Sequence, residues 1–256
     1  MKKKTILVVV ILLTAVTTAF AQTAADFSVE LTADGNGVII KRYTGKVTAV
    51  IVPNVIEGLP VREIGKQAFS GRGNITSVTL PNGITKIGEE AFKYQEKLSS
   101  VNIPNSVTEI GNQAFSQCFA LKSIDIPGSV TSFGYGIFAN SGLERFTLGE
   151  GITVIPHTMF SQCKITSVVI PEGVIEIKMG AFVNNSMLTS VTLPSTIKKI
   201  ERDAFGSSGL ITITIPDSVE TIEFGDEWGN NVFSGCPKLN LASQAALKRR
   251  SYTGSF

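Results

Sequence analysis

The sequence of 256 residues has little of the chemistry that enzymes and metal proteins use. It contains one histidine, three cysteines and one tryptophan, and 17% of its residues are charged, below the roughly one quarter usual in soluble domains. No P-loop, EF-hand, H-E-x-x-H or Cys/His cluster occurs. Hydrophobic residues make up 43% of the chain, which excludes intrinsic disorder. The composition therefore disfavours catalysis, and no metal or cofactor is predicted.

Residues 1–21 have the pattern of a secretory signal peptide. Three lysines at positions 2–4 precede an apolar run from Ile6 to Leu13, and an Ala-Phe-Ala sequence ends at Ala21. The run is too short for a membrane-spanning helix. Loss of the three lysines lowers the net charge from +2 to −1, so nothing attracts the mature chain to nucleic acid or anionic lipid. We expect an exported protein, in the periplasm, at the cell surface or secreted, without a transmembrane anchor or a nucleic-acid partner.

A period of 22 or 23 residues runs through the mature chain. Phenylalanine recurs with this spacing, apart from a last interval of 28, at Phe69, Phe92, Phe115, Phe138, Phe160, Phe182, Phe205 and Phe233. Five further apolar columns share the period, and the first of them is Val47, Ile75, Leu98, Leu121, Leu143, Ile165, Leu188 and Leu210. Such self-similarity is the signature of a solenoid, in which stacked coils place like side chains on one another.

Each unit predicts two short extended segments joined by turns. Val78-Thr79-Leu80 alternates with period two, which indicates a strand with one buried face. Pro81 ends this strand because proline cannot donate to a sheet ladder. Residues 85–88 form a second extended segment, and 89–92 form at most one helical turn. Eight such coils, ~4.8 Å apart, make a rod or arc on the order of 40 Å long.

The fold prediction is a predominantly β repeat solenoid of about eight units, residues 47–238, with a cap at each end. Caps are needed because terminal coils expose apolar surface and open strand edges. Residues 22–46 should form a hairpin whose strands, Phe27 to Leu31 and Val38 to Tyr43, flank a glycine-rich turn. Residues 239–256 should form the C-terminal cap, with a short helix over 241–250.

The repeat pattern L-x-x-[VI]-x-[LI]-P-x-x-[VI]-x-x-I-G-x-x-A-F-x-x-C resembles the bacterial BspA-like, or Treponema-type, leucine-rich repeat from residue 47 to about 239. The resemblance implies an exported or surface-displayed protein, since several members of that family are described as adhesins that bind host matrix proteins. Two departures occur. Gly149 replaces the proline of its unit, and the glycine of the I-G pair becomes Pro156, Lys178, Glu201 and Glu223 in the last four units. We expect these units to turn differently on that edge.

The outward positions of the first strand carry the first candidate partner-binding residues. Most are small hydroxyl residues, but charge gathers in two neighbouring units at Lys122, Asp125, Glu144 and Arg145. Leucine-rich repeat proteins commonly bind partners on the concave face, so the resemblance makes these four a candidate contact cluster. The alternative is cross-strand charge pairs worth about a few tenths of a kcal/mol. Asp125 and Glu144 could also be the paired acids of a glycoside hydrolase, although solvated surface positions are the simpler interpretation.

Two insertions interrupt the period, and insertions into solenoid repeats often lie on a binding face. One covers residues 54–60, and the other, residues 223–231, contains the single tryptophan. Asp226, Glu227 and Trp228 are therefore the second candidate partner-binding group, unless that loop packs over the end coil instead. Its acidic residues could hold calcium, but their spacing matches no known calcium loop.

The cysteines and the histidine are predicted to be structural. Cys118, Cys163 and Cys236 each follow a phenylalanine by three residues, and the first two are two coils, or ~10 Å, apart. A disulfide needs Cα atoms within ~7 Å, so three buried free thiols acting as small hydrophobes are expected. His157 falls on a turn, and surface serines are so common that a neighbouring serine would not indicate a triad.

The sequence thus predicts a monomeric, non-catalytic protein-interaction module, and the resemblance implies a cell-surface or secreted adhesin whose partners are host matrix proteins or other bacterial proteins. The alternative is a structural or scaffold protein of the bacterial envelope or periplasm. A carbohydrate-active enzyme is a remote third possibility.

Overall fold

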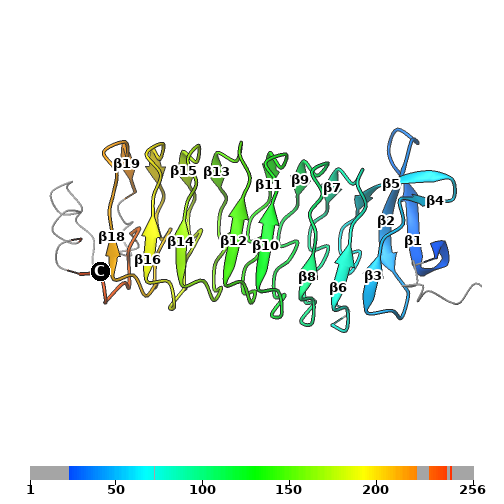
Figure 1. Ribbon diagram of the computed structural model, residues 1–256, viewed down its shortest axis with the longest axis horizontal. Coiled ribbons are helices and arrows are strands. Elements are labelled where there is room, and N and C mark those ends of the chain that lie inside the picture. The colour runs from blue at the N-terminus through cyan, green and yellow to red at the C-terminus, as the bar shows by residue number, and fades with distance from the viewer. Residues whose placement is uncertain (1–22, 72, 224–230, 241–242, 244–256) are drawn as a thin grey trace, which may run out of the picture.

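A computed structural model describes residues 23–71, 73–223, 231–240 and 243 (Figure 1). The chain forms a parallel β-solenoid of about eight coils, which confirms the predicted fold class. Helix is almost absent from the described residues: a short 3-10 turn, η1 (Ala24–Asp26), precedes the first strand. Each complete coil contributes two short strands, so two rows of strands run along the length of the molecule.

A hairpin closes the N-terminal end. Strand β1 (Phe27–Leu31) pairs antiparallel with β2 (Val38–Tyr43), as the sequence predicts. Strand β2 then pairs in parallel with β5 (Leu59–Ile64), so the hairpin continues the sheet of the coils that follow. The first insertion forms β4 (Val55–Ile56), which pairs antiparallel with β5. The N-terminal cap is thereby joined to the solenoid through backbone hydrogen bonds.

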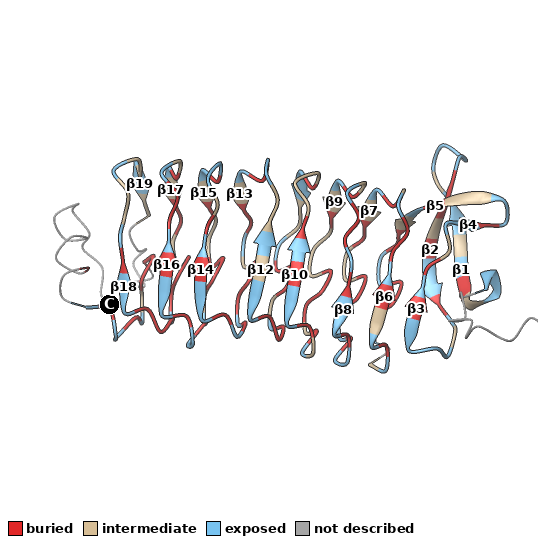
Figure 2. Ribbon diagram, in the orientation of Figure 1, coloured by how far each residue is buried: buried red, intermediate tan, exposed pale blue. Residues whose placement is uncertain are grey.

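The first strands of the coils form one row, which we call the first-strand face. They are β3 (Ala49–Ile51), β6 (Ser77–Thr79), β8 (Ser100–Val101), β10 (Ser123–Ile126), β12 (Arg145–Leu148), β14 (Ser167–Val169), β16 (Ser190–Thr192) and β18 (Thr212–Ile213). Their ladder has three separate segments, β3-β6-β8, β10-β12 and β14-β16-β18. Buried and exposed residues alternate along these strands (Figure 2), so one side of each strand faces the core and the other faces solvent.

The second strands form the other row. They are β7 (Lys86–Ile87), β9 (Glu109–Ile110), β11 (Ser132–Phe133), β13 (Val154–Ile155), β15 (Glu176–Ile177), β17 (Lys199–Ile200) and β19 (Thr221–Ile222). One ladder runs from the hairpin to β11, and another runs from β13 to β19. The row is therefore interrupted once among the described strands, between β11 and β13.

The interruption coincides with the change in the repeat pattern. The N–H of Gly134 donates to the carbonyl of Ile110 at 2.8 Å, and the N–H of Lys178 donates to that of Ile155 at 2.9 Å. Pro156 occupies the equivalent position between them and has no N–H, so the ladder bond to Phe133 cannot form. The expected change of turn is confined to this one unit, because the later units keep the bond despite having lost the glycine.

Gly149 has the opposite effect on the first-strand side of the same unit. Its N–H donates to the carbonyl of Ile126 at 2.7 Å, a bond that the proline of other units could not make. A Cβ on Gly149 would lie 2.2 Å from the nitrogen of Gly128, so only glycine allows this approach. Between the same two coils, Gly149 thus adds a backbone hydrogen bond on the first-strand side, and Pro156 removes one on the second-strand side.

Stacked aromatic rings form the centre of the core. From Tyr43 to Phe233, successive rings lie 4.9–5.9 Å apart with interplanar angles of 4–24°. The sequence period did not reveal Tyr43, which extends the stack into the cap and donates its hydroxyl to the carbonyl of Val47 at 2.9 Å. Val47 itself, expected in a buried column, is 41% exposed. Because β3 ends its ladder, no coil covers Val47 on the outer side.

The column three residues after each phenylalanine is buried and polar. Its described members are Gln95, Cys118, Ser141, Cys163, Asn185, Ser208 and Cys236. Cys118 donates its thiol to the carbonyl of Phe92 in the preceding coil at 3.3 Å, and Asn185 binds the carbonyl of Phe160 in the same way at 2.8 Å. The three cysteines are free and buried, which confirms that prediction, but they act as hydrogen-bond donors and not only as small hydrophobes.

Candidate functional site

The four charged residues predicted on the first-strand face lie together on its middle segment, β10-β12. The two strands are parallel, with Ser123 opposite Arg145 and Asp125 opposite Thr147. Lys122 and Glu144, each just before its strand, form an ion pair with Nζ 3.0 Å from Oε1. The hydroxyl of Thr147 donates to Asp125 at 2.6 Å. Three of the four predicted residues are therefore engaged in cross-strand contacts, the alternative that the sequence left open.

Arg145 differs from the other three residues. It is exposed at the start of β12, and within the described part of the chain its side chain has no hydrogen bond or ion pair. The Lys122–Glu144 pair is half exposed and neutralises itself, so it is worth at most ~1 kcal/mol. Arg145 is thus the cation of this segment that can bind a partner, and arginine is among the residues enriched in binding hot spots.

A hollow of about 380 Å³ adjoins these charges between β8 and β10, where the first-strand ladder is interrupted. Exposed polar residues form its rim, namely Ser99, Ser100, Asn102, Ser123 and Asp125. Val101, Ile103 and Ile124 also line it, but their side chains are buried in the core columns, so they present mainly backbone to the hollow. The hollow is therefore a small concave site with a predominantly polar lining.

Asn102 is bonded away from β10. Its Oδ1 accepts the N–H of Leu80 at 2.7 Å, and its Nδ2 donates to the carbonyl of Leu80 at 2.9 Å. The amide is thus committed to the preceding coil on both its donor and acceptor sides. Asparagine commonly competes with secondary structure in this way by bonding to nearby backbone.

The hydroxyl groups on this face are partly used between coils. Thr76 donates to the carbonyl of Thr48 at 3.2 Å, Ser99 to that of Thr76 at 3.0 Å and Thr189 to that of Thr166 at 3.2 Å. A hydroxyl whose proton is donated inward still has lone pairs facing outward. These three hydroxyls therefore present lone pairs to a partner.

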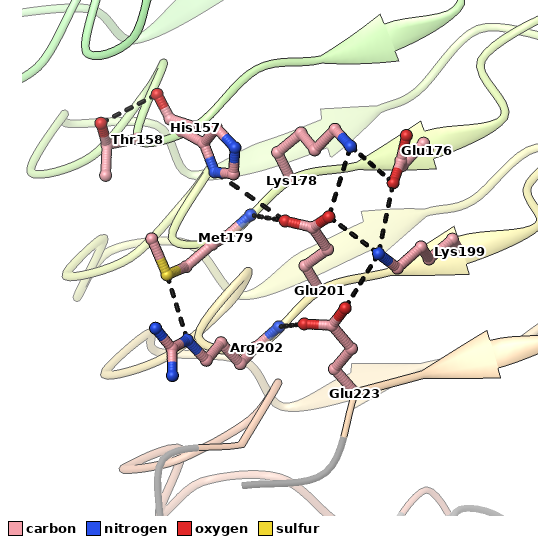
Figure 3. Close-up of polar contacts among 9 residues, drawn as sticks. All are labelled: His157, Thr158, Glu176, Lys178, Met179, Lys199, Glu201, Arg202 and Glu223. Carbon is pink, nitrogen blue, oxygen red and sulfur yellow. Dashed lines mark hydrogen bonds and ion pairs between the residues drawn. The ribbon is translucent and has the colours of Figure 1, made fainter. Parts of the chain in front are cut away.

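A second charged cluster, which the sequence reasoning did not identify, lies on the second-strand row (Figure 3). Glu201 is only 8% exposed, and its carboxylate lies 2.9 Å from Lys199 Nζ and 3.3 Å from Lys178 Nζ. It also accepts the N–H of Met179 at 2.8 Å. Burial alone would raise the pKa of Glu201, but the hydrogen bonds from Lys199 and Met179 and the charge of Lys178 lower it to about 2.

Two further glutamates complete this cluster. Glu176 lies 2.7 Å from Lys178, and Glu223 lies 2.9 Å from Lys199, whose pKa is raised first by the hydrogen bonds of Glu223 and Glu201. Every carboxylate thus contacts a lysine, and the pairs connect successive coils. The sequence feature that could have revealed this cluster is the replacement of the I-G glycine by charged residues in the last three units. The network joins the coils that follow the Pro156 interruption.

His157 lies beside the charged cluster of the second-strand row. The residue lies on the turn before Phe160, as predicted, and its Nδ1 is 3.8 Å from Glu201 Oε2. Among the described residues, no three His, Cys, Asp or Glu side chains are grouped as a metal site would require, and no helix has the length and apolar character to span a membrane.

The remaining predicted features fall on residues whose placement is not described. Asp226, Glu227 and Trp228 lie outside the described residues, so the second partner-binding group stays a prediction. The same holds for residues 1–21 and for the helix expected over 241–250, of which Ser243 alone is described.

Comparisons with known proteins agree with this architecture. The sequence matches the family model described as BspA type leucine rich repeat region, in six copies, over residues 44–166 and 153–244. A leucine-rich repeat protein from T. pallidum is 27% identical with a TM-score of 0.63, and the match covers 92% of this chain and 98% of that one. A leucine-rich repeat protein from Bacteroides ovatus is 27% identical with a TM-score of 0.61, covering 84% of this chain and 62% of that one. This chain therefore spans less than two thirds of the B. ovatus protein. No match was found among the curated proteins.

Proposed function

Since this chain belongs to the BspA-type leucine-rich repeat family, we propose that it is an exported adhesin, displayed on the bacterial surface or secreted, that binds other proteins without catalysis. The family and the solenoid fold support a repeat module for protein interaction. Export, surface display and adhesion go further: export rests on the signal-peptide pattern of residues 1–21, and surface display and adhesion rest on the resemblance to the family.

The observation that carries this proposal is the combination of the hollow beside β10 with Arg145, which is exposed and has no side-chain partner among the described residues. Together they give the first-strand face one region that differs from the surrounding hydroxyl-bearing coils. The strands of this region are fixed by the buried columns beneath them, so little conformational freedom is lost when a partner binds. A rigid, locally charged face of this kind suits the binding of a folded protein or an extended peptide.

The acids of the same region support a non-catalytic role. Glu144 is paired with Lys122, and Asp125 accepts a hydrogen bond from Thr147. A glycoside hydrolase needs one protonated acid and one free carboxylate on either side of the scissile bond. Turnover of any glycan that is lost on changing Asp125 or Glu144 would contradict this part of the proposal.

The direct test is affinity capture with the mature chain, residues 22–256, from host matrix extract and from bacterial envelope extract. Arg145→Ala should weaken binding of the captured partner at least tenfold, because it removes the exposed cation of the site. Arg42→Ala is the matched control, since Arg42 is an exposed arginine of β2 in the cap. Equal recovery with the wild type, Arg145→Ala and Arg42→Ala would contradict the assignment of the site.

Location is tested separately by protease treatment of intact cells. A surface adhesin should be degraded while a cytoplasmic marker survives. Protection in intact cells, followed by degradation after the envelope is permeabilised, would contradict surface display and support a scaffold role inside the envelope instead.

A further inference from the structure

The hollow between β8 and β10 has a composition that selects for one kind of side chain. Its rim contains one carboxylate, Asp125, and four neutral polar residues, but no lysine or arginine. The nearest lysine in the sequence, Lys122, is paired with Glu144 at 3.0 Å. Asp125 therefore forms no ion pair within the described part of the molecule.

The free acceptor sites of Asp125 favour a ligand group that donates hydrogen bonds. A carboxylate has about four acceptor sites, and Asp125 uses one for Thr147 at 2.6 Å. Ser99 donates its proton to the carbonyl of Thr76, and Asn102 uses its oxygen and one of its two N–H groups for Leu80, so Asp125 is the charged acceptor of the rim. A group that brings several N–H donors and a positive charge complements this rim, and the side chains of arginine and lysine have that chemistry.

The size of the hollow agrees with a single side chain as its occupant. Its volume of about 380 Å³ lies near the lower end of the ~300–1,000 Å³ found for small-molecule pockets. Val101 and Ile124 are 8% and 4% exposed, so the outward residues Ser99, Ser100, Asn102, Ser123 and Asp125 are the ones that surround the charged end of a long basic side chain in the hollow.

The position of Arg145 adds a second requirement. Ser123, on the rim of the hollow, is the strand partner of Arg145, so the cation stands one strand, ~4.8 Å, beyond the rim. In an extended peptide, side chains on the same face are two residues, ~6.6 Å, apart. An acidic side chain two positions from the inserted basic residue can therefore reach Arg145.

We propose that the first-strand face binds an extended segment of a partner protein, with a basic side chain inserted in the β8–β10 hollow against Asp125 and an acidic side chain two residues away paired with Arg145. This inference rests on the proposed protein-binding function and specifies the chemistry of the partner. In this proposal the carboxylate of Asp125 pairs with the basic side chain of the partner. Asn102 keeps the hollow open because its amide is bonded to Leu80 and not to β10.

The test uses the mature chain and the peptide acetyl-Gly-Arg-Gly-Glu-Gly-amide as the probe, followed by NMR. Binding should be in the millimolar range and shift the backbone signals of residues 99–103, 123–125 and 145. Replacing the arginine of the peptide by citrulline, which has the same shape without the charge, should weaken binding at least fivefold. Equal shifts with the citrulline peptide, or no shifts at these residues, would overturn the proposal.

Protein variants separate this inference from the broader function. Asp125→Asn should weaken binding of the arginine peptide at least fivefold. Glu57→Gln, which changes an exposed acid in the β4–β5 turn, should leave this binding unchanged. If Arg145→Ala weakens a captured partner but Asp125→Asn does not, the hollow is not a binding site and the proposed function still stands. If sedimentation shows self-association that Asp125→Asn abolishes, the occupant is a second copy, and the inference of a foreign partner fails.

Discussion

Replacing Phe115 by alanine tests whether stacking of like side chains holds the solenoid together. The ring is fully buried and lies 5.1 Å from that of Phe92 and 5.4 Å from that of Phe138, nearly parallel to both. Truncation of a buried phenylalanine costs about 3–5 kcal/mol, and each aromatic pair adds about 0.5–1.5 kcal/mol. Because every coil is supported only by its neighbours, both interfaces weaken. Phe115→Ala should lower the free energy of unfolding by roughly 4–8 kcal/mol.

Urea unfolding followed by circular dichroism measures this loss. Phe119→Ala is the matched control, because Phe119 is an aromatic residue of the same coil that is 43% exposed, and its loss should cost less than about 1 kcal/mol. Phe115→Leu keeps most of the apolar volume and loses only the ring pairs, so it should cost about 1–2 kcal/mol and remain folded. Similar losses for Phe115→Ala and Phe119→Ala would refute the reasoning.

Glu201→Gln removes an acceptor shared by two lysines and should cost roughly 1–3 kcal/mol at pH 7. Because the folded pKa of Glu201, about 2, lies below its ordinary 4.5, this stabilisation is complete above pH 4.5 and is lost as the pH falls towards 2. Urea titrations should therefore show the two proteins converging in acid, and a constant difference would exclude this origin. Burial raises the pKa of Cys118 to about 12 and that of Cys163 to about 11, so neither thiol should react with a thiol reagent at pH 8 until the chain unfolds; rapid labelling of the native protein would show that they are accessible. Gly128→Ala places a Cβ 1.8 Å from the carbonyl oxygen of Glu150 and should cost about 1–3 kcal/mol in thermal unfolding, whereas an unchanged melting temperature would mean that these coils are not in close contact.

The sequence predicts the core because stacking repeats the same environment in every coil. Phe92 and Phe115 have equivalent neighbours, so a period in the sequence corresponds directly to a column in space. The correspondence fails at the end of the stack, where a coil has a neighbour on one side only. Val47 fits the period but is exposed, and Tyr43 lies outside the period although its ring completes the stack.

The charged site is only partly predictable, for a related reason. Strand alternation places Asp125 and Arg145 on the outward face, as the structure shows. Which charges are paired depends on the register between coils, which brings Lys122 beside Glu144 and leaves Arg145 free of contacts among the described residues. The hollow has no periodic signal, because it lies where Asn102 bonds to the backbone of the preceding coil.

The two departures from the repeat pattern act on opposite sides of the same coil. Pro156 interrupts the second-strand ladder, while β10 and β12 stay paired across the same pair of coils. The proposed binding region therefore includes the β10-β12 ladder, which the 2.7 Å hydrogen bond from Gly149 to Ile126 extends at its end. A site in this position is held in place despite the break on the opposite side.

Hydrogen exchange of the mature chain, with and without its captured partner, tests the central claim most directly. Strand β8 pairs with β6 and β10 pairs with β12, so the amides of β8 and β10 that face each other have no ladder partner. These amides should exchange rapidly in the free protein and slowly in the complex. The account predicts that protection on binding is confined to residues 99–103, 122–126 and 144–148. Protection restricted to the second-strand row, with these three segments unchanged, would contradict it.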